Sequence, residues 1–336
     1  MADKKRYRGV VIGCGKIGAL FEAEPRRAKP ASHAGALVSN KKTDLVALVD
    51  TGKKNLAHAK RLFPGVALYT SSESCFKSEQ PDIVIIATPA NVRVPLVRLC
   101  VKYGVKMIIC EKPLARSAAE ARQIRNILKG TKTVFVLNYQ RRFSPLFTRA
   151  RNEISKGSIG RVQQVTCYYS NGLYNNGGHI IDALNFLLGD TITSAIGLLN
   201  ANNRTCPQGD INVDGILRTK CGAVITIQSF DQNAYGIHDI KILGEKGAIT
   251  LTSFGQRGIW EFARESQFAG IKQLTSSSSK ELVVPLSATK GALEHAMRCR
   301  EKGSMPESGP ESGTAVLNAL DALRKSAARG GMHVRV

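Results

Sequence analysis

The stretch VVIGCGKIG, residues 10–18, decides the fold of the first third of the chain. Its apolar start is typical of a buried strand, and its three glycines fit the pattern G-x-G-x-x-G. Such glycines allow a tight turn, let the backbone approach a pyrophosphate, and permit close packing of the following helix, whose first N–H groups bind phosphate. The stretch predicts a dinucleotide-binding turn, with a purely structural turn as the alternative. The residues expected at the cofactor are Gly13, Gly15, Lys16, Ile17 and Gly18.

Short apolar runs alternate with segments of helical spacing through the first 140 residues. Continuous runs rich in Val and Ile indicate a parallel sheet covered on both faces, and handedness rules then favour a doubly wound α/β domain. The expected strands are 9–12, 45–49, 66–69, 83–87, 106–110 and 134–137. The expected helices between them are 55–62, 92–103 and 117–129.

After residue 138 the pattern changes to consecutive strands, which favours a mainly antiparallel sheet. Glycines in RTKCGAV and LGEKGAI stand where antiparallel hairpins turn. We expect a dinucleotide-binding domain over 1–120, with its last strand reaching to about 140, and a second α/β domain over 121–336. The polar segment 275–281 reads as a flexible loop. The expected strands of this part are 162–169, 192–200, 211–219, 223–229, 237–243 and 248–252, and the helices are 145–156, 179–188, 291–300 and 314–328.

Composition and charge argue against several classes of function, namely membrane-spanning, secreted, zinc-binding and nucleic-acid-binding proteins. The 336 residues include 43% hydrophobic residues, without a membrane-spanning apolar run or a secretory signal, and eight scattered cysteines without a CxxC pair. This pattern argues against zinc and disulfides and suits a reducing cytoplasm. The net charge of +22 is spread in short pairs rather than in a basic helix, so we expect neither a nucleic acid nor a membrane partner. Most of the charge reads as solvated surface, with attraction of an anionic substrate or cofactor as the alternative.

The second strand, DLVALVD, ends at Asp50, where an acidic side chain is expected to bind the adenine ribose hydroxyls of NAD. Asp50 follows Gly18 by 32 positions, and the segment FEAEPRRAKPASHAG accounts for the excess as an inserted loop. A carboxylate here would repel the extra phosphate of NADP, so NAD is the expected cofactor. NADP stays possible because Lys53 and Lys54 follow closely. The alternative role for Asp50 is a cap on the next helix.

The fifth strand ends in the charged pair Glu111 and Lys112, followed by Pro113. Ligands of a doubly wound sheet bind beyond the carboxyl ends of its strands, so this pair is expected beside a nicotinamide. A cationic lysine next to an oxidised nicotinamide is disfavoured, which makes Lys112 a candidate general base for a hydroxyl proton. Pro113 would restrict the backbone, with a cis bond among its options, and fix the direction of the lysine. The alternative is an ordinary surface lysine at a strand end.

Motifs along nearly the whole chain resemble those of the Gfo/Idh/MocA family of sugar and polyol oxidoreductases. They are GCGKIG, SHAGAL, IIATPANV, CEKPLA, NYQRRFSPLF, GSIGRVQQV, GGHIIDALNFLLGD, IKILGEKGAI and MPESGPESGTAVLNALDALRKSA. The resemblance implies a Rossmann domain and a second α/β domain whose open sheet binds substrate and mediates dimerisation, in a homodimer or homotetramer. It also implies hydride transfer between a nicotinamide and a sugar-like hydroxyl or ketone, nucleotide sugars included, with Lys112 in catalysis. The further cofactor contacts that it implies are Thr88, Pro89 and Glu111.

One position departs from the family pattern. Relatives commonly pair the lysine with an Asp and a His in D-x-x-x-H; here His179 matches the histidine, but Asn175 stands at the Asp position. An asparagine can hydrogen-bond a substrate but cannot accept a proton as a carboxylate does. Asp182, one helical turn after His179, is a candidate carboxylate on the same face, or else a first-turn acid favoured by the helix dipole. The family position also suggests substrate contacts for Arg142, which has a structural alternative, and for Tyr235.

Three functions follow from this reading. The first is an NAD(P)-dependent dehydrogenase or reductase acting on a CH–OH group of a sugar or polyol. The second is redox-neutral glycosidic cleavage that uses tightly held NAD transiently. The third is a cofactor-binding regulatory protein with an impaired relay, which Asn175 permits.

Overall fold

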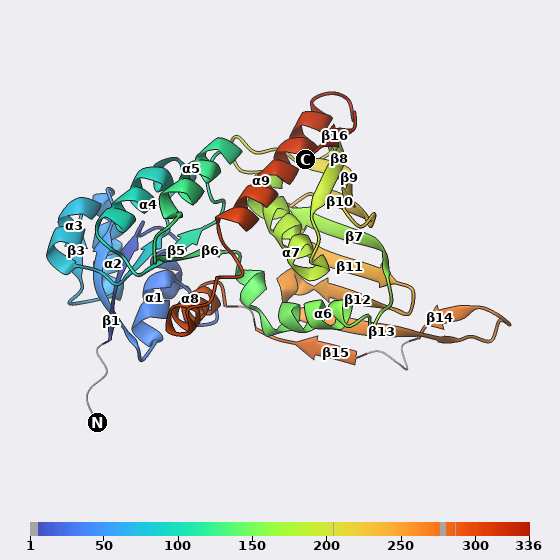
Figure 1. The fold of residues 1–336 in the computed structure, drawn as a ribbon, viewed down its shortest axis with the longest axis horizontal. Helices are drawn as coiled ribbons and strands as arrows, with labels where there is room; N and C mark the ends of the chain where they lie inside the picture. Colours follow the sequence, from blue (N-terminus) through green and yellow to red (C-terminus); the bar gives the residue numbers. More distant parts are fainter. Residues whose placement is uncertain (1–5, 204, 276–279, 286) are drawn as a thin grey trace. The chain divides into compact units, whose positions relative to one another are not determined.

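The computed structural model describes residues 6–203, 205–275, 280–285 and 287–336 (Figure 1). The chain divides into two compact units, Met1–Phe143 with Ser287–Thr314, and Ser144–Leu286 with Ala315–Val336. The expected first domain was 1–120 with its last strand reaching to about 140; in the structure the first unit extends to Phe143 and also includes a segment from near the end of the chain. Of the expected flexible loop at 275–281, residues 276–279 lie outside the described part of the chain.

The first unit contains a six-stranded parallel sheet in the order β3-β2-β1-β4-β5-β6. This order is that of a doubly wound dinucleotide-binding sheet, as the alternation of strands and helices predicted. The two central strands after the chain reversal, β4 and β5, are entirely buried, which explains their uninterrupted apolar sequence. The strands are β1 (Tyr7–Ile12), β2 (Thr43–Val49), β3 (Ala67–Tyr69), β4 (Ile83–Ile86), β5 (Met107–Glu111) and β6 (Val134–Asn138).

Helices cover both faces of this sheet, with α1 and α8 on one face and α4 and α5 on the other (Figure 1). The helix α8 follows the second unit in the chain but packs on β5 and β6. Its buried face, which includes Leu293 and Met297, joins the same core as Ile109 and Val136, so burial of that face holds this segment in the first unit. The helices of the unit are α1 (His33–Ser39), α2 (Lys53–Leu62), α3 (Ser72–Glu79), α4 (Arg93–Lys102), α5 (Ala118–Leu128) and α8 (Lys290–Lys302).

The expected inserted loop interrupts the helix that should follow the glycine-rich turn. The chain forms only the short 3-10 helix η1 (Leu20–Ala23) before it leaves the turn, and it returns at α1. The first N–H groups of α1, those of His33 and Ala34, donate to the carbonyls of Ile17 and Gly18 at 3.0 and 2.9 Å. Backbone hydrogen bonds therefore connect the turn directly to α1, and the residues between Gly18 and His33 form a loop inserted between them.

The second unit contains a ten-stranded sheet in the order β14-β13-β12-β11-β7-β10-β9-β8-β16, with β15 paired to β13. Only β7 and β10 run parallel among the described pairs of this sheet, so the mostly antiparallel sheet is confirmed. Both expected hairpins are present, β9–β10 and β11–β12. The strands are β7 (Val162–Ser170), β8 (Ile192–Leu199), β9 (Val213–Thr219), β10 (Val224–Phe230), β11 (His238–Gly244), β12 (Gly247–Thr252), β13 (Arg257–Glu265), β14 (Lys272–Leu274), β15 (Lys280–Val283) and β16 (Val334–Arg335).

Three helices, α6 (Pro145–Ser155), α7 (Gly178–Leu188) and α9 (Pro310–Ala327), accompany this sheet (Figure 1). The approach of α9 to β8 is close, because a Cβ added to Gly197 would lie 2.6 Å from the carbonyl oxygen of Leu323. The helix α7 is apolar almost all round and is buried along most of its length. Within the described ranges, no helix combines the length and the apolar character that a membrane span requires.

Candidate active site

The glycine-rich turn has the geometry that its sequence predicts. Gly13 adopts φ +95°, and a Cβ there would lie 2.7 Å from the carbonyl oxygen of Ala87, at the end of β4. A Cβ on Gly18 would lie 1.8 Å from the carbonyl oxygen of Gly13, so no other residue fits at that position. A Cβ on Gly15 would meet no atom within 4 Å. The backbone at Gly15 is therefore open to a ligand, while the other two glycines are closed by the protein itself.

Asp50, at the carboxyl end of β2, faces this turn. Its carboxylate accepts hydrogen bonds from the N–H of Cys14 and of Gly52, both at 2.7 Å, and from the side chain of Asn55 at 3.1 Å. Gly52 is the N-cap residue of α2 and no side chain caps this helix, so the alternative role of Asp50 as a cap on the next helix was wrong. Burial, followed by the charge of Asp50, raises the pKa of the Cys14 thiol to about 12, so this thiol stays neutral.

A buried hydrogen-bond network surrounds Glu111 at the end of β5. One carboxylate oxygen lies 2.8 Å from Nε2 of His33 and accepts from the side-chain amide of Asn138 at 2.7 Å. The other accepts from the N–H of Lys112 at 3.2 Å. Burial raises the pKa of Glu111, but the bond and charge of His33, the bond from Asn138 and the charge of Lys112 outweigh it. The pKa of Glu111 lies below the usual glutamate range, so a carboxylate stands directly before the candidate lysine.

Arg93 fixes the backbone around the candidate lysine. Its guanidinium, 2% exposed, donates to the carbonyl oxygens of Thr88, Glu111 and Lys112, with the Thr88 bonds at 3.2 and 2.7 Å. These carbonyls follow β4 and β5, so one buried cation joins the carboxyl ends of both strands. The peptide bond between Lys112 and Pro113 is cis, one of the options that the sequence allowed.

Arg142 has a partner inside its own unit. It lies in the 3-10 helix η3 (Gln140–Phe143), is 9% exposed, and donates to the carbonyl oxygen of Glu307 at 2.8 Å. This bond ties the end of the Rossmann sheet to the segment that follows α8. The structural alternative for Arg142 is thereby supported.

In the second unit, Asn175 lies in the π-helix η4 (Leu173–Gly177), directly before α7. The carboxylate of Asp210 accepts the N–H groups of Tyr174 and Asn175 at 3.0 and 2.9 Å, and the side chain of Asn175 donates to the carbonyl oxygen of Asn171 at 3.1 Å. A Cβ on Gly172 would lie 2.2 Å from Asp210. The unit therefore holds a carboxylate beside Asn175, supplied by a different part of the chain.

His179 is the second residue of α7, and its ring lies next to a second histidine. The ring centroids of His179 and His238 are 6.4 Å apart, and His238 is 2% exposed at the start of β11. Asp182 is 1% exposed and lies beyond the first turn of α7, so the interpretation as a first-turn acid was wrong. Tyr235 is 60% exposed, and its ring lies 4.5 Å from that of Phe230.

Comparison with known proteins identifies the family. Residues 7–139 match the model described as an oxidoreductase family with an NAD-binding Rossmann fold, and residues 170–250 match the model of a GFO/IDH/MocA C-terminal domain. The chain belongs to the Gfo/Idh/MocA family of oxidoreductases. Among curated members, inositol 2-dehydrogenase 2 of Saccharopolyspora erythraea is 25% identical over 256 residues, which cover 72% of each chain.

Solved structures show the same fold over the full length. A levoglucosan dehydrogenase in complex with NADH and L-sorbose gives a TM-score of 0.78 at 19% identity and covers 99% of both chains. The WlbA dehydrogenase from Bordetella pertussis, in complex with NADH and UDP-GlcNAcA, gives 0.79 at 18% identity, covering 100% of this chain and 99% of the other.

NAD is the cofactor of this family's Rossmann domain, and the residues of the first unit fit it. Besides the open backbone at Gly15, three buried side-chain atoms at the carboxyl edge have no hydrogen-bond partner in the described part of the chain: Nδ1 of His33, Oγ1 of Thr88 and Oδ1 of Asn138. Buried polar groups normally find partners, so these atoms are suited to a polar ligand. Pro89, expected at the cofactor, follows Thr88 at the same edge and is exposed.

The sequence reasoning missed four residues at these sites, namely His33, Arg93, Asp210 and His238. His33 lies in SHAGAL, one of the motifs of the resemblance, whereas His238 lies two residues before the motif IKILGEKGAI and outside it. Arg93 and Asp210 carry no local signal, because each acts on backbone groups that are distant in sequence. Groups of three or more His, Cys, Asp or Glu side chains that would hold a metal are absent from the described ranges.

Proposed function

We propose that this protein catalyses NAD-dependent hydride transfer at a CH–OH group of a sugar or polyol. The observation that carries the proposal is the buried side chain of Glu111, which is held by His33 and Asn138 immediately before Lys112 at the carboxyl edge of the Rossmann sheet. The named relatives are consistent with the substrate class, since they include an inositol dehydrogenase and structures with L-sorbose or a nucleotide sugar. In this proposal the first unit binds the dinucleotide and the second binds the substrate.

The cofactor would be held by the turn from Gly13 to Gly18, with Asp50 at the adenine ribose and Thr88 near the nicotinamide half. When bound, NAD⁺ supplies the acceptor for the hydride that leaves the substrate carbon. Lys112 takes the hydroxyl proton on its neutral amine, so the alcohol becomes a carbonyl and the lysine becomes an ammonium. In the reverse direction the ammonium returns that proton to the carbonyl oxygen. The carboxylate of Glu111 stabilises the cation formed in the forward reaction.

Substrate contacts in this proposal come from the second unit. His179 is proposed to act in catalysis together with Lys112. Asn175 offers hydrogen bonds to sugar hydroxyls, and Asp210 positions Asn175 through its backbone N–H. Asp182 and Tyr235 stay candidates for further contacts, with burial of Asp182 favouring an indirect role. The buried Arg142 is proposed to support the sheet edge rather than to touch the substrate.

We also propose that the protein self-associates through the sheet of its second unit, as a homodimer or homotetramer. Three strands of this sheet expose large apolar side chains, namely Tyr168 on β7, Leu198 on β8 and Ile216 on β9. Exposed apolar side chains on one sheet are typical of an interaction surface. The eight free cysteines suit the cytoplasm, the proposed location.

The test is turnover with NAD⁺ or NADP⁺ against inositols, free sugars, uronates and nucleotide sugars, followed by the absorbance of reduced nicotinamide. Lys112→Ala should retain NAD⁺ affinity and lose about 10²- to 10⁴-fold in kcat, the usual contribution of a general base. Lys77→Ala, an exposed lysine on α3, is the matched control and should leave kcat unchanged.

Two results would contradict the proposal. NAD that co-purifies with the protein and shows no net reduction while the protein cleaves a glycoside would favour the redox-neutral reaction. NAD⁺ binding without turnover of any substrate would favour the regulatory role and make Asn175 the residue to change first.

A further inference from the structure

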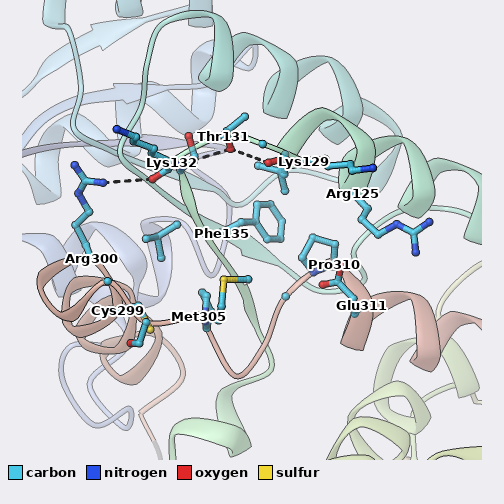
Figure 2. A pocket seen from close by; sticks show the side chains of 18 of the residues that line it. Arg125, Lys129, Thr131, Lys132, Phe135, Cys299, Arg300, Met305, Pro310 and Glu311 are labelled. Carbon is cyan, nitrogen blue, oxygen red and sulfur yellow. Dashed lines mark hydrogen bonds between the residues drawn. The ribbon is translucent and has the colours of Figure 1, made fainter.

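A groove of about 820 Å³ lies in the first unit, away from the carboxyl edge of the sheet. It runs between the end of α5 with its following loop, the start of β6, and the segment that joins α8 to α9 (Figure 2). Its floor is apolar, with Phe135 at 4% exposure and Pro310 buried, and Met305 stands over it at 88% exposure. Phe135 and Met305 both face the hollow in Figure 2.

The groove lies along the edge of the Rossmann sheet, where no further strand pairs with β6 in the described residues. The strand β6 is the last in the sheet order, and the N–H of Val134 donates to the carbonyl oxygen of Lys106 on the β5 side. Since backbone groups of successive residues point to opposite sides of a strand, the N–H and C=O of Phe135 point away from β5. Two residues on, the same edge is closed, because Leu137 N–H donates to the carbonyl oxygen of Ser308 at 2.9 Å. The open edge is therefore the part of β6 that lines the groove.

The rim of the groove is strongly cationic. Arg125, Lys129, Lys132 and Arg300 line the groove, and the acidic residue among its described lining residues is Glu311 on α9. All four basic side chains are exposed, and within the residues that the structure describes none of them forms an ion pair. Arg300 instead donates to the carbonyl oxygen of Lys132 at 3.3 Å, which joins α8 to the loop before β6. The rim is thus complementary to a ligand that carries several negative charges.

We propose that this groove binds an acidic polypeptide segment in an extended conformation, which adds as a strand to the edge of β6 at Phe135. Main-chain bonds to an open edge supply affinity in such complexes, while alternate side chains supply specificity. One set of side chains would lie over Phe135 and Pro310, where the flexible thioether of Met305 can adapt to them. The other set, glutamates or aspartates, would lie along the basic rim. An open sheet edge matches a polypeptide backbone, and it is the feature that favours a peptide over a compact polyanion.

The test uses a capped, fluorescently labelled ten-residue peptide in which glutamate alternates with valine or threonine. Fluorescence anisotropy with the full chain should give a Kd of about 10–100 μM, as for a short peptide at a partly open edge. The same peptide with N-methyl groups on alternate amides cannot pair with β6 and should bind at least tenfold more weakly. Hydrogen exchange of the segment 131–137 should slow when the unmodified peptide binds.

Charge reversal tests the rim. The double variant Lys129→Glu/Lys132→Glu should bind the peptide at least tenfold more weakly. The control variant Lys41→Glu/Lys60→Glu changes two exposed lysines of the same unit that do not line the groove, and its affinity for the peptide should change less than twofold. NAD⁺ affinity of each variant checks that the unit is folded. Equal binding of the methylated peptide, or displacement of the peptide by tripolyphosphate at equal charge, would overturn the proposal in favour of a simple anion site. Absence of binding would mean that the lysines only shield a sheet edge from aggregation.

Discussion

Glu111 connects the chemistry of the site with the stability of the fold. Its carboxylate is buried, and three donors from different elements converge on it, those of His33, Lys112 and Asn138. In Glu111→Gln the new amide group would face the N–H of Lys112 or the side chain of Asn138, so two donors would oppose each other. We expect a loss of about 2 kcal/mol in the free energy of unfolding at pH 7, measured by urea denaturation.

The pKa of Glu111 adds a pH dependence. Because its pKa is lower in the folded state than in the unfolded state, the carboxylate stabilises the fold at neutral pH, and this stabilisation is lost as pH falls below about 5. The wild type should therefore lose more stability between pH 6 and pH 4 than Glu111→Gln does. Glu294→Gln on α8, whose side chain is 42% exposed, should retain the wild-type slope. Equal slopes in all three proteins would contradict the ionised state of Glu111.

Asp50 is the residue that should separate NAD⁺ from NADP⁺. Its carboxylate stands at the glycine-rich turn, bonded to the N–H of Cys14, where the charge would repel a ribose phosphate. Asp50→Asn should lower the ratio of NAD⁺ to NADP⁺ affinity about tenfold, equivalent to about 1.4 kcal/mol, in calorimetric titrations with both cofactors. Asp44→Asn, an exposed position on the same strand, should leave that ratio unchanged. An unchanged ratio in Asp50→Asn would mean that Asp50 only holds the turn through its bonds to the N–H groups of Cys14 and Gly52.

At the scale of elements, the inserted loop is held by one side chain. Glu22 accepts the N–H of Ala31 and of Ser32 at 3.1 and 3.0 Å and the hydroxyl of Ser32 at 2.8 Å, while Ser32 caps α1 by accepting the N–H of Gly35. A carboxylate at the start of α1 is favourable both as a hydrogen-bond acceptor and for the helix dipole. Glu22 therefore holds the end of the loop in position at the start of α1.

Two substitutions test this arrangement together. Glu22→Ala should cost about 1–2 kcal/mol in the free energy of unfolding, as for loss of a cap. Gly35→Ala should cost more, because its Cβ would lie 2.1 Å from the Glu22 carboxylate. In the Glu22→Ala background the same Gly35→Ala change should cost less than 0.5 kcal/mol, roughly the size of ordinary additivity error, since the clashing group is gone. Additive losses in urea denaturation would show that Glu22 does not contact α1.

The elements that the sequence predicted well are those with strong periodicity. The strands β4 and β5 are unbroken apolar runs, and the helices α5 and α6 have clear apolar faces. Neither α3 nor β13 was predicted from the sequence: α3 buries only Cys75 and Phe76, and β13 buries only Gly258 and Trp260 and carries several charged residues. Short or charged elements such as these form because neighbouring elements supply their partners, and a local pattern cannot report that.

The site shows the same limit. The glycine-rich turn, Asp50 and the pair of Glu111 and Lys112 follow strands directly, so the carboxyl-end rule located them. The contacts of Arg93 and Asp210 join segments that are 18 and 35 positions apart, and no sequence motif predicts these contacts. The sequence also did not predict that α8 belongs to the first unit, because only the burial of its apolar face decides which sheet it packs on.

For the whole molecule, the net charge of +22 should affect the rate at which substrates arrive. A basic protein attracts anions over long distances, and salt screens this attraction with a Debye length of about 8 Å at physiological ionic strength. If a uronate is a substrate, its kcat/KM should fall about tenfold between 20 and 300 mM NaCl. For an uncharged polyol, kcat/KM should change less than twofold. A salt dependence that is equal for both substrates would exclude electrostatic steering.

Chemical rescue can show whether Lys112 transfers the substrate proton in an NAD-dependent reaction. The measurement is kcat of Lys112→Ala with its best substrate in increasing methylammonium concentration at alkaline pH, where free methylamine can enter the space left by the side chain. We expect kcat to rise in proportion to the concentration of free amine, and kcat of Lys77→Ala to be unaffected by it. A Lys112→Ala variant with wild-type kcat, or one that binds NAD⁺ and substrate but responds to no amine at any pH, would contradict it.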